Sequence, residues 1–305
     1  MVRSWRWCSV AAAMTMLAVA PPADAVPTGT YVDRGTLRIV AAPGDRTVQV
    51  AVEQFDGGEA PGPGSYTDVV GHVRLTADVP CGSLEGRFHQ CDGTPHRVVL
   101  DGGQAHADFS VKAWDSAYVE ARLTAGARGG HLVTRASHAT FIGRRGPDRV
   151  TYRLDDSSGS ALERGELVVA TGRGDDVVVL QGTGAILHGP HGSPAVIRLG
   201  AGDDKFRARI VHGPAPVRVL GRAGADDLQA GSDDASYGGP GDDILGNGRL
   251  IVGGSGRDVI TAGWQTLRIR AADGEADSVT CLSRRTVVHA DPVDRVSGCR
   301  VVLHA

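Results

Sequence analysis

Aspartate preceded by closely spaced glycines recurs along the second half of this chain of 305 residues. Four segments fit the pattern Gly-x-Gly-x-Asp-x-apolar, namely 172–178, 200–206, 239–245 and 254–260. Ca²⁺ takes six to eight oxygen ligands from carboxylates and carbonyls in a loosely held geometry. Glycine reaches backbone conformations that turn carbonyls toward one point. The spacing therefore indicates cation binding by glycine carbonyls together with the carboxylate two residues after the second glycine.

The candidate metal ligands are the glycines and aspartates of these segments and the aspartate of a weaker copy: Gly172, Gly174, Asp176, Gly200, Gly202, Asp204, Asp226, Gly239, Gly241, Asp243, Gly254, Gly256 and Asp258. Gly and Asp also make tight turns without any ion, which is the competing interpretation. On coils stacked about 4.8 Å apart, neighbouring acids repel by about 1–3 kcal/mol. Because Asn or Ser could make the turn without this repulsion, the repeated acid favours a cation between the coils.

The elements that position these residues follow from the repeat itself. The repeated aspartate falls at positions 148, 176, 204, 226, 243, 258 and 277, and short apolar segments lie between the copies. A strand, a turn, a second strand and a Gly-Asp loop make one coil of a parallel β-solenoid, which buries its apolar residues only by stacking on the next coil. One register of apolar residues should form a single inward ladder: Val178, Phe206, Leu228, Leu245, Ile260 and Val279.

The expected fold is all-β, with a β-roll-like parallel β-solenoid preceded by a small antiparallel β-domain. Residues 26–140 contain short alternating strands separated by Gly- and Pro-rich turns, which predict that β-domain. The solenoid is expected over 141–280, and a C-terminal cap held by a disulfide over 281–305. Residues 1–25, which precede these three regions, are expected to form a separate N-terminal segment.

This N-terminal segment has the features of a secretory signal peptide. Arg3 and Arg6 precede an apolar stretch from Val10 to Ala20, and Ala23 and Ala25 provide a small-x-small cleavage pattern. The apolar stretch is too short to span a bilayer stably. We expect cleavage after Ala25 and a secreted, extracellular protein.

Four cysteines remain after that cleavage: Cys81, Cys91, Cys281 and Cys299. An even number in a secreted chain indicates disulfides. The sequence does not fix their connectivity, but the local pairs Cys81–Cys91 and Cys281–Cys299 are the simplest choice.

The repeats resemble the calcium-binding nonapeptide Gly-Gly-x-Gly-x-Asp-x-apolar-x of hemolysin-type (RTX) proteins, which 238–246 and 253–261 match at every specified position. The chain as a whole resembles secreted, actinobacterial-type calcium-binding proteins that join an N-terminal β-region to such repeats. The resemblance implies Ca²⁺ as the bound ion. RTX arrays repeat the motif every nine residues, whereas copies here are at least about twice as far apart, which implies metal binding along one edge of the solenoid only.

The composition of the chain argues against several functional classes of protein. A net charge of −3 argues against a nucleic-acid binder, and the sequence has no second apolar segment for membrane insertion. We expect a monomer that is not an enzyme, with calcium ions as partners and a cell-wall or glycan partner left open. The alternatives are a polysaccharide lyase or epimerase, for which Lys112 or Lys205 is conceivable, and an adhesive carbohydrate-binding protein. His188 and His191 are more simply surface residues than zinc ligands.

Overall fold

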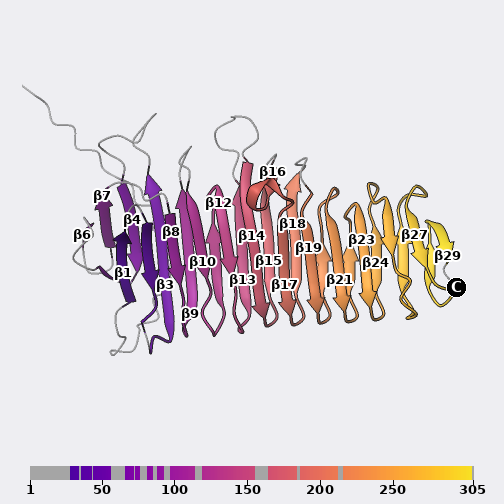
Figure 1. The fold of residues 1–305 in the computed structure, drawn as a ribbon, viewed down its shortest axis with the longest axis horizontal. Helices are drawn as coiled ribbons and strands as arrows, with labels where there is room; N and C mark the ends of the chain where they lie inside the picture. The colour runs from indigo at the N-terminus through magenta and orange to yellow at the C-terminus, as the bar shows by residue number, and fades with distance from the viewer. Residues whose placement is uncertain are drawn as a thin grey trace, which may run out of the picture.

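A computed structural model of the chain consists almost entirely of β-strands, arranged as successive coils along one long axis (Figure 1). It describes residues 28–33, 36–42, 44–55, 66–71, 73–75, 81–84, 88–92, 97–113, 119–154, 164–183, 186–211 and 216–303. The expected signal peptide lies outside these residues. The described residues contain one short 3-10 helix, η1 (Pro190–Gly192), and no helix that is long and apolar enough to cross a membrane.

The strands form two sheets. Sheet A contains β1 (Thr28–Asp33), β2 (Thr36–Val40), β5 (Val73–Leu75), β8 (Arg97–Asp101), β10 (Glu120–Thr124), β12 (His138–Ile142), β14 (Arg164–Arg173), β16 (Ile186–His188), β17 (Val196–Ala201), β19 (Arg218–Ala223), β21 (Ala235–Pro240), β23 (Leu250–Ser255), β25 (Arg268–Arg270), β27 (Val287–Ala290) and β29 (Arg300–Leu303).

Sheet B contains β3 (Thr47–Phe55), β4 (Tyr66–Gly71), β6 (Cys81–Leu84), β7 (Phe88–Asp92), β9 (His106–Ala113), β11 (Gly130–Thr134), β13 (Asp148–Leu154), β15 (Val177–Thr183), β18 (Lys205–Val211), β20 (Asp227–Gln229), β22 (Ile244–Gly246), β24 (Val259–Ala262), β26 (Ser278–Cys281) and β28 (Arg295–Ser297). From β8 onward the chain alternates between the sheets, except that the consecutive strands β16 and β17 both belong to sheet A. Each strand pairs in parallel with its counterpart in the next coil, as β21 does with β23. The predicted parallel β-solenoid is confirmed.

Antiparallel pairing is confined to the N-terminal end, where it joins β1 to β2, β3 to β4, β4 to β7 and β6 to β7. Parallel pairing already begins at β2 with β8 and at β3 with β9. No change in topology therefore marks residue 140, where the sequence suggests a domain boundary. The coils over 97–142 lack the Gly-x-Gly-x-Asp signature because they turn on other sequences, such as 125–129, which is why the repeat does not reveal them.

The core lies between the two sheets as columns of buried side chains. The six residues expected to form one inward ladder are in register on consecutive strands of sheet B and are at most 1% exposed. Sheet A contributes the facing column, which from β17 to β27 consists of Ile197, Val219, Ser236, Ile251, Ile269 and Val288. Burying each such aliphatic side chain contributes about 1.5–3 kcal/mol. Stacking therefore stabilises the solenoid along its whole length.

The C-terminal segment continues the coils. Strand β27 pairs with β25, β28 with β26, and β29 with β27, so residues 281–303 complete the solenoid rather than form a separate cap. The predicted Cys281–Cys299 disulfide is confirmed, with a Cα–Cα distance of 5.2 Å. The register of β6 and β7 places Cys81 opposite Cys91. The disulfide between Cys81 and Cys91 stays a prediction, because the structure describes the backbone of these two residues but not their side chains.

The Gly-Asp loops form one corner of the solenoid, where each sheet A strand leads into a sheet B strand. We call these six-residue turns the Gly-Asp corner; they span 143–148, 171–176, 199–204, 221–226, 238–243 and 253–258. In four of the five pairs of successive turns, the N–H at the fourth position donates to the carbonyl at the third position of the next turn, as from Gly241 to Ser255 at 2.8 Å. Successive turns are thus hydrogen-bonded to each other directly.

Glycine occupies the fourth position of all six turns and the second position of four of them, where it fits this close stacking; Arg144 and Arg222 take the second position in the other two. Gly254 has a φ of +123°, and a Cβ there would lie 1.9 Å from the carbonyl oxygen of Gly239 in the preceding coil. Each of the eight glycines assigned to the metal site has a positive φ. Glycine at these positions therefore has a packing cause that operates with or without an ion.

We predict that Gly254→Ala destabilises the protein by at least about 2 kcal/mol more than Gly274→Ala, because strain and backbone overlap act together at position 254. Gly274 is the matched control: its φ is +92°, but a Cβ there meets nothing within 4 Å. Urea unfolding of both variants measures the difference. Equal losses would show that the coils are not packed this closely.

Candidate functional site

The aspartates at the sixth position of the Gly-Asp corner point inward and, together with Asp277 of the following coil, form a continuous column. The aspartate column comprises Asp148, Asp176, Asp204, Asp226, Asp243, Asp258 and Asp277. Every member is at most 2% exposed. The structure therefore brings together all the aspartates assigned to metal binding, including Asp226, whose turn has Arg222 at the second position.

Backbone hydrogen bonds connect the column from coil to coil. The N–H of each column aspartate donates to Oδ1 of the aspartate in the next coil, with N···O distances of 2.7 to 2.9 Å. The last of these bonds runs from Asp277 to Asp294. Asp294 lacks the paired glycines and was missed as a column member, although its spacing of 17 residues from Asp277 is typical of the repeat.

The second carboxylate oxygen of the column has no such partner. Oδ2 is buried and without a hydrogen-bond partner among the described residues in Asp204, Asp226, Asp243, Asp258 and Asp277. Leaving a buried polar atom unpaired costs about 1–3 kcal/mol, and more when it is charged. None of the ion pairs between described residues includes a column aspartate. These oxygens are therefore available to a proton or to a cation.

Two oxygens from successive coils converge beside the first glycine of the turn. The Cβ position of Gly238, which glycine leaves empty, lies 2.0 Å from Oδ2 of Asp243 and 2.4 Å from the carbonyl oxygen of Gly253. At Gly221 the corresponding distances are 2.1 Å to Oδ2 of Asp226 and 2.7 Å to the carbonyl of Gly238. The candidate site thus also involves first-position glycines, which were not assigned to it. The Gly-Gly doublets at 238–239 and 253–254 are their signal in the sequence.

Burial raises the pKa of every column carboxyl, and neighbouring carboxylates add to this effect at several positions. The pKa rises to about 8 for Asp148, to about 7 for Asp204, Asp243 and Asp277, and to about 6 for Asp176, Asp226 and Asp258. At Asp243 burial has the largest effect, the N–H of Asp226 opposes it, and the carboxylates of Asp226 and Asp258 reinforce it. The metal-free column is therefore partly protonated near neutral pH.

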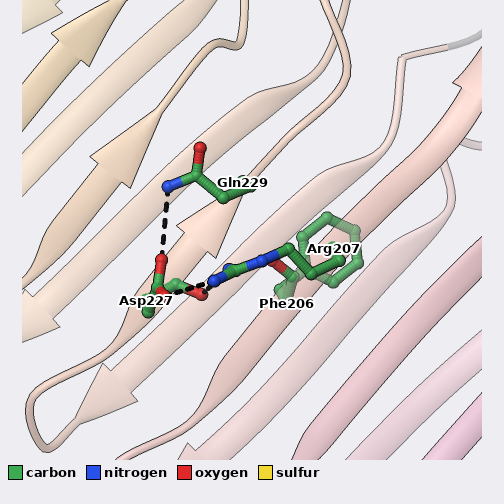
Figure 2. Close-up of polar contacts among 4 residues, drawn as sticks. All are labelled: Phe206, Arg207, Asp227 and Gln229. Atoms are coloured by element: carbon green, nitrogen blue, oxygen red, sulfur yellow. Dashed lines mark hydrogen bonds and ion pairs between the residues drawn. The ribbon is translucent and has the colours of Figure 1, made fainter.

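The adjacent residue Asp227 shows the opposite behaviour (Figure 2). Its side chain points outward on sheet B, where it forms an ion pair with Arg207 and accepts a hydrogen bond of 3.2 Å from Gln229. Burial raises the pKa of Asp227, but the hydrogen bonds and charge of Arg207 outweigh it and leave the pKa below its ordinary value. Asp227, which forms an ion pair, is therefore adjacent in the sequence to Asp226, whose Oδ2 has no partner among the described residues.

A second line of acids runs along the outside of the corner at the fifth position. Oδ1 of Asp175 accepts the N–H of Asp203 at 3.1 Å, and Oδ1 of Asp242 accepts that of Arg257 at 2.8 Å. Arg257 also lies 3.7 Å from Oδ2 of Asp242, with both side chains exposed. These exposed acids connect the turns in the opposite direction to the aspartate column. The sequence signals them as Asp-Asp doublets.

The donor set limits how an ion could be held. No group of three or more His, Cys, Asp or Glu side chains in the described part of the chain is arranged to hold a metal ion. An ion at the corner would therefore take backbone oxygens together with one or two carboxylates, a combination that suits Ca²⁺. His188 lies on β16 with its Nδ1 3.2 Å from the carbonyl of Gly189, and His191 lies in η1.

The two lysines considered for a lyase are not brought together. Lys112 on β9 forms an ion pair with Glu53, whereas Lys205 on β18 is exposed. Three sheet B strands, β11, β13 and β15, lie between β9 and β18.

We predict that, without metal, the free energy of unfolding falls as the pH rises from about 4 to about 8. Each column carboxyl has a higher pKa in the folded state than in the unfolded chain, so the folded state binds more protons and loses stability as they leave. Thermal melting in a chelator across this range tests the sign. Asp243→Asn should flatten the decline, since Asn keeps an Oδ1 acceptor without a charge. Stability that rises with pH would contradict the burial of unpaired acids.

Comparison with family models, with curated proteins and with solved structures finds no match to this chain. The resemblance to hemolysin-type repeats therefore depends on the motif residues alone.

Proposed function

We propose that this protein is a calcium-ion-binding β-solenoid, in which cations along the Gly-Asp corner stabilise the stacked coils. The observation that carries the proposal is the aspartate column: its Oδ2 atoms are buried without a hydrogen-bond partner, and none of the ion pairs between described residues includes one of its carboxylates. A cation shared between coils would satisfy these oxygens and remove the repulsion between neighbouring carboxylates.

Calcium fits the available donors better than zinc does. The corner offers carboxylate and carbonyl oxygens, whereas zinc prefers cysteine sulfur and histidine nitrogen. The proposed ligands are the carboxylates of Asp176, Asp204, Asp226, Asp243 and Asp258, with carbonyl oxygens of the corner glycines. The convergence of Asp243 Oδ2 and the Gly253 carbonyl supports a site assembled from two successive coils.

Binding of this kind would contribute directly to folding. A site with a dissociation constant of about 10⁻⁴ M in about 1 mM calcium stabilises the folded state by roughly 1.4 kcal/mol. The contribution grows with pH because calcium competes with the protons that burial retains on the column. Several such sites together would shift the melting temperature by many degrees.

A secreted location is part of the proposal. The signal-peptide pattern of residues 1–25 supports it, and so does the Cys281–Cys299 disulfide, because such bonds persist in oxidising compartments. Extracellular calcium would then be available at the concentration assumed above.

We predict that calcium raises the melting temperature of the wild-type protein and gives a saturable heat of binding by titration calorimetry at pH 7.5. The double variant Asp243→Asn and Asp258→Asn should lose part of both signals, because it removes two adjacent carboxylates while preserving their Oδ1 acceptors. Magnesium at the same concentration should have a smaller effect, since it demands a stricter octahedral geometry.

Asp242→Asn is the matched control, because Asp242 lies next to the column residue Asp243 in the sequence but is exposed. It should retain the calcium response. Equal uptake of calcium by the wild-type protein and the double variant would show that the column aspartates are turn-forming residues and not ligands.

A further inference from the structure

The outer face of sheet A between β17 and β29 carries exposed arginines and no acidic side chain. Outward and inward side chains alternate along each strand, so the residues of this face are fixed by the burial pattern. We call its cationic residues the arginine face: Arg198, Arg218, Arg222, Arg268, Arg270 and Arg300. All six are exposed.

The strand register arranges five of these arginines in two adjacent columns, whereas Arg222 lies farther along β19, opposite Gly200. Arg218, Arg268 and Arg300 share one column, in which Arg268 lies three coils after Arg218 and two before Arg300. Arg198 and Arg270 share the other column, four coils apart. At about 4.8 Å per coil, the separations along the axis are about 10 to 19 Å. The positive charges are therefore spread along the face.

The positions between the arginines are apolar or aromatic. Leu220, Tyr237, Val252 and His289 complete the column of Arg198 and Arg270, and all four are half-buried. The surface thus combines guanidinium groups with flat apolar patches.

The charge of this face is not compensated within the described part of the chain. None of its six arginines takes part in an ion pair there, whereas Arg97 pairs with Glu120 and Arg144 with Asp101 near the N-terminal end of the same sheet. A surface that served only solubility would intersperse both signs. Uncompensated arginines on a flat sheet indicate a partner of negative charge.

We propose that the arginine face binds a linear polysaccharide that carries carboxylates, with its chain lying along the solenoid axis. The guanidinium group is planar and matches a carboxylate with two parallel hydrogen bonds. The coil spacing is close to the length of one sugar ring in an extended chain, and the apolar positions can accept ring faces. Extended solenoid faces commonly form binding surfaces.

The same features disfavour a nucleic acid. Duplex DNA presents one charge per about 1.7 Å of axis, far denser than the arginines here, and single strands bind on series of stacking aromatics that this face lacks. The acidic Gly-Asp corner adjoins the face, and the net charge of the chain is −3. A polymer whose charges are farther apart than those of a nucleic acid therefore matches the spacing of the arginines better. The inference is independent of any ion at the corner.

The test is binding of the purified protein to immobilised polygalacturonate, a linear polyuronate, measured in low salt with chelator present so that calcium does not crosslink the polymer. The wild-type protein should bind saturably and release the polymer as salt increases, and it should not bind a neutral linear glucan. The double variant Arg268→Gln and Arg270→Gln should lose about tenfold or more in affinity, as expected for two charge-assisted contacts.

The matched control is Arg149→Gln with Arg209→Gln, which removes two exposed arginines from the outer face of sheet B. This control should bind like the wild-type protein, and both variants should keep the wild-type melting temperature. The proposal is overturned if the wild-type protein does not bind polygalacturonate, if both variants weaken equally, or if single-stranded DNA or a sulfated glucan binds more tightly than the polyuronate.

Discussion

The structure depends on how a column of buried carboxylates is accommodated. Strand pairing fixes the coil spacing, and the inward position of each aspartate places its carboxylate about 4.8 Å from the next one. Oδ1 is satisfied by a backbone N–H from the preceding coil, but Oδ2 is not satisfied within the described residues. If the column carboxylates were all charged, neighbouring ones would repel each other, and burying their charge would cost free energy as well. Each carboxylate therefore needs either a proton or a cation that it shares with a neighbouring coil. The glycine at position 238 fits the same arrangement, because Asp243 Oδ2 occupies the space beside it.

The apolar core, the acidic Gly-Asp corner and the arginine face occupy three different parts of the solenoid. Apolar columns between the sheets provide stability along its full length, including the coils over 97–142, whose corners carry no buried acid. The Gly-Asp corner concentrates negative charge on one edge, where glycines such as Gly254 stack too closely on the preceding turn to admit a Cβ. The outer face of sheet A concentrates arginines in the C-terminal half. Segregation of charge onto different surfaces reconciles a small net charge with two surfaces that could each bind an ion or polymer of opposite sign.

Much of this arrangement was predictable because the repeat specifies it locally. The shared register of Val178, Phe206 and Leu228 in the repeat predicted the inward ladder, and the Gly-Asp spacing predicted the aspartate column. The coils over 97–142 were not predictable from the repeat, because their corners use other turn sequences while keeping the same parallel pairing. The hydrogen bonds of the column, the membership of Asp294 and the contact of Oδ2 with the first glycine depend on distances between coils, which the sequence does not contain. The arginine face was likewise hidden, since the register alone aligns residues as distant as Arg198 and Arg270.

The protonation state of the column carboxyls tests the central claim most directly. In protein labelled with carbon-13 at the aspartate side-chain carboxyl, nuclear magnetic resonance can follow each carboxyl through a pH titration with and without calcium. The account predicts that the column carboxyls titrate near pH 6–8 in chelator and remain ionised down to a distinctly lower pH when calcium is present. Carboxyl signals and titration midpoints that do not respond to calcium would contradict it.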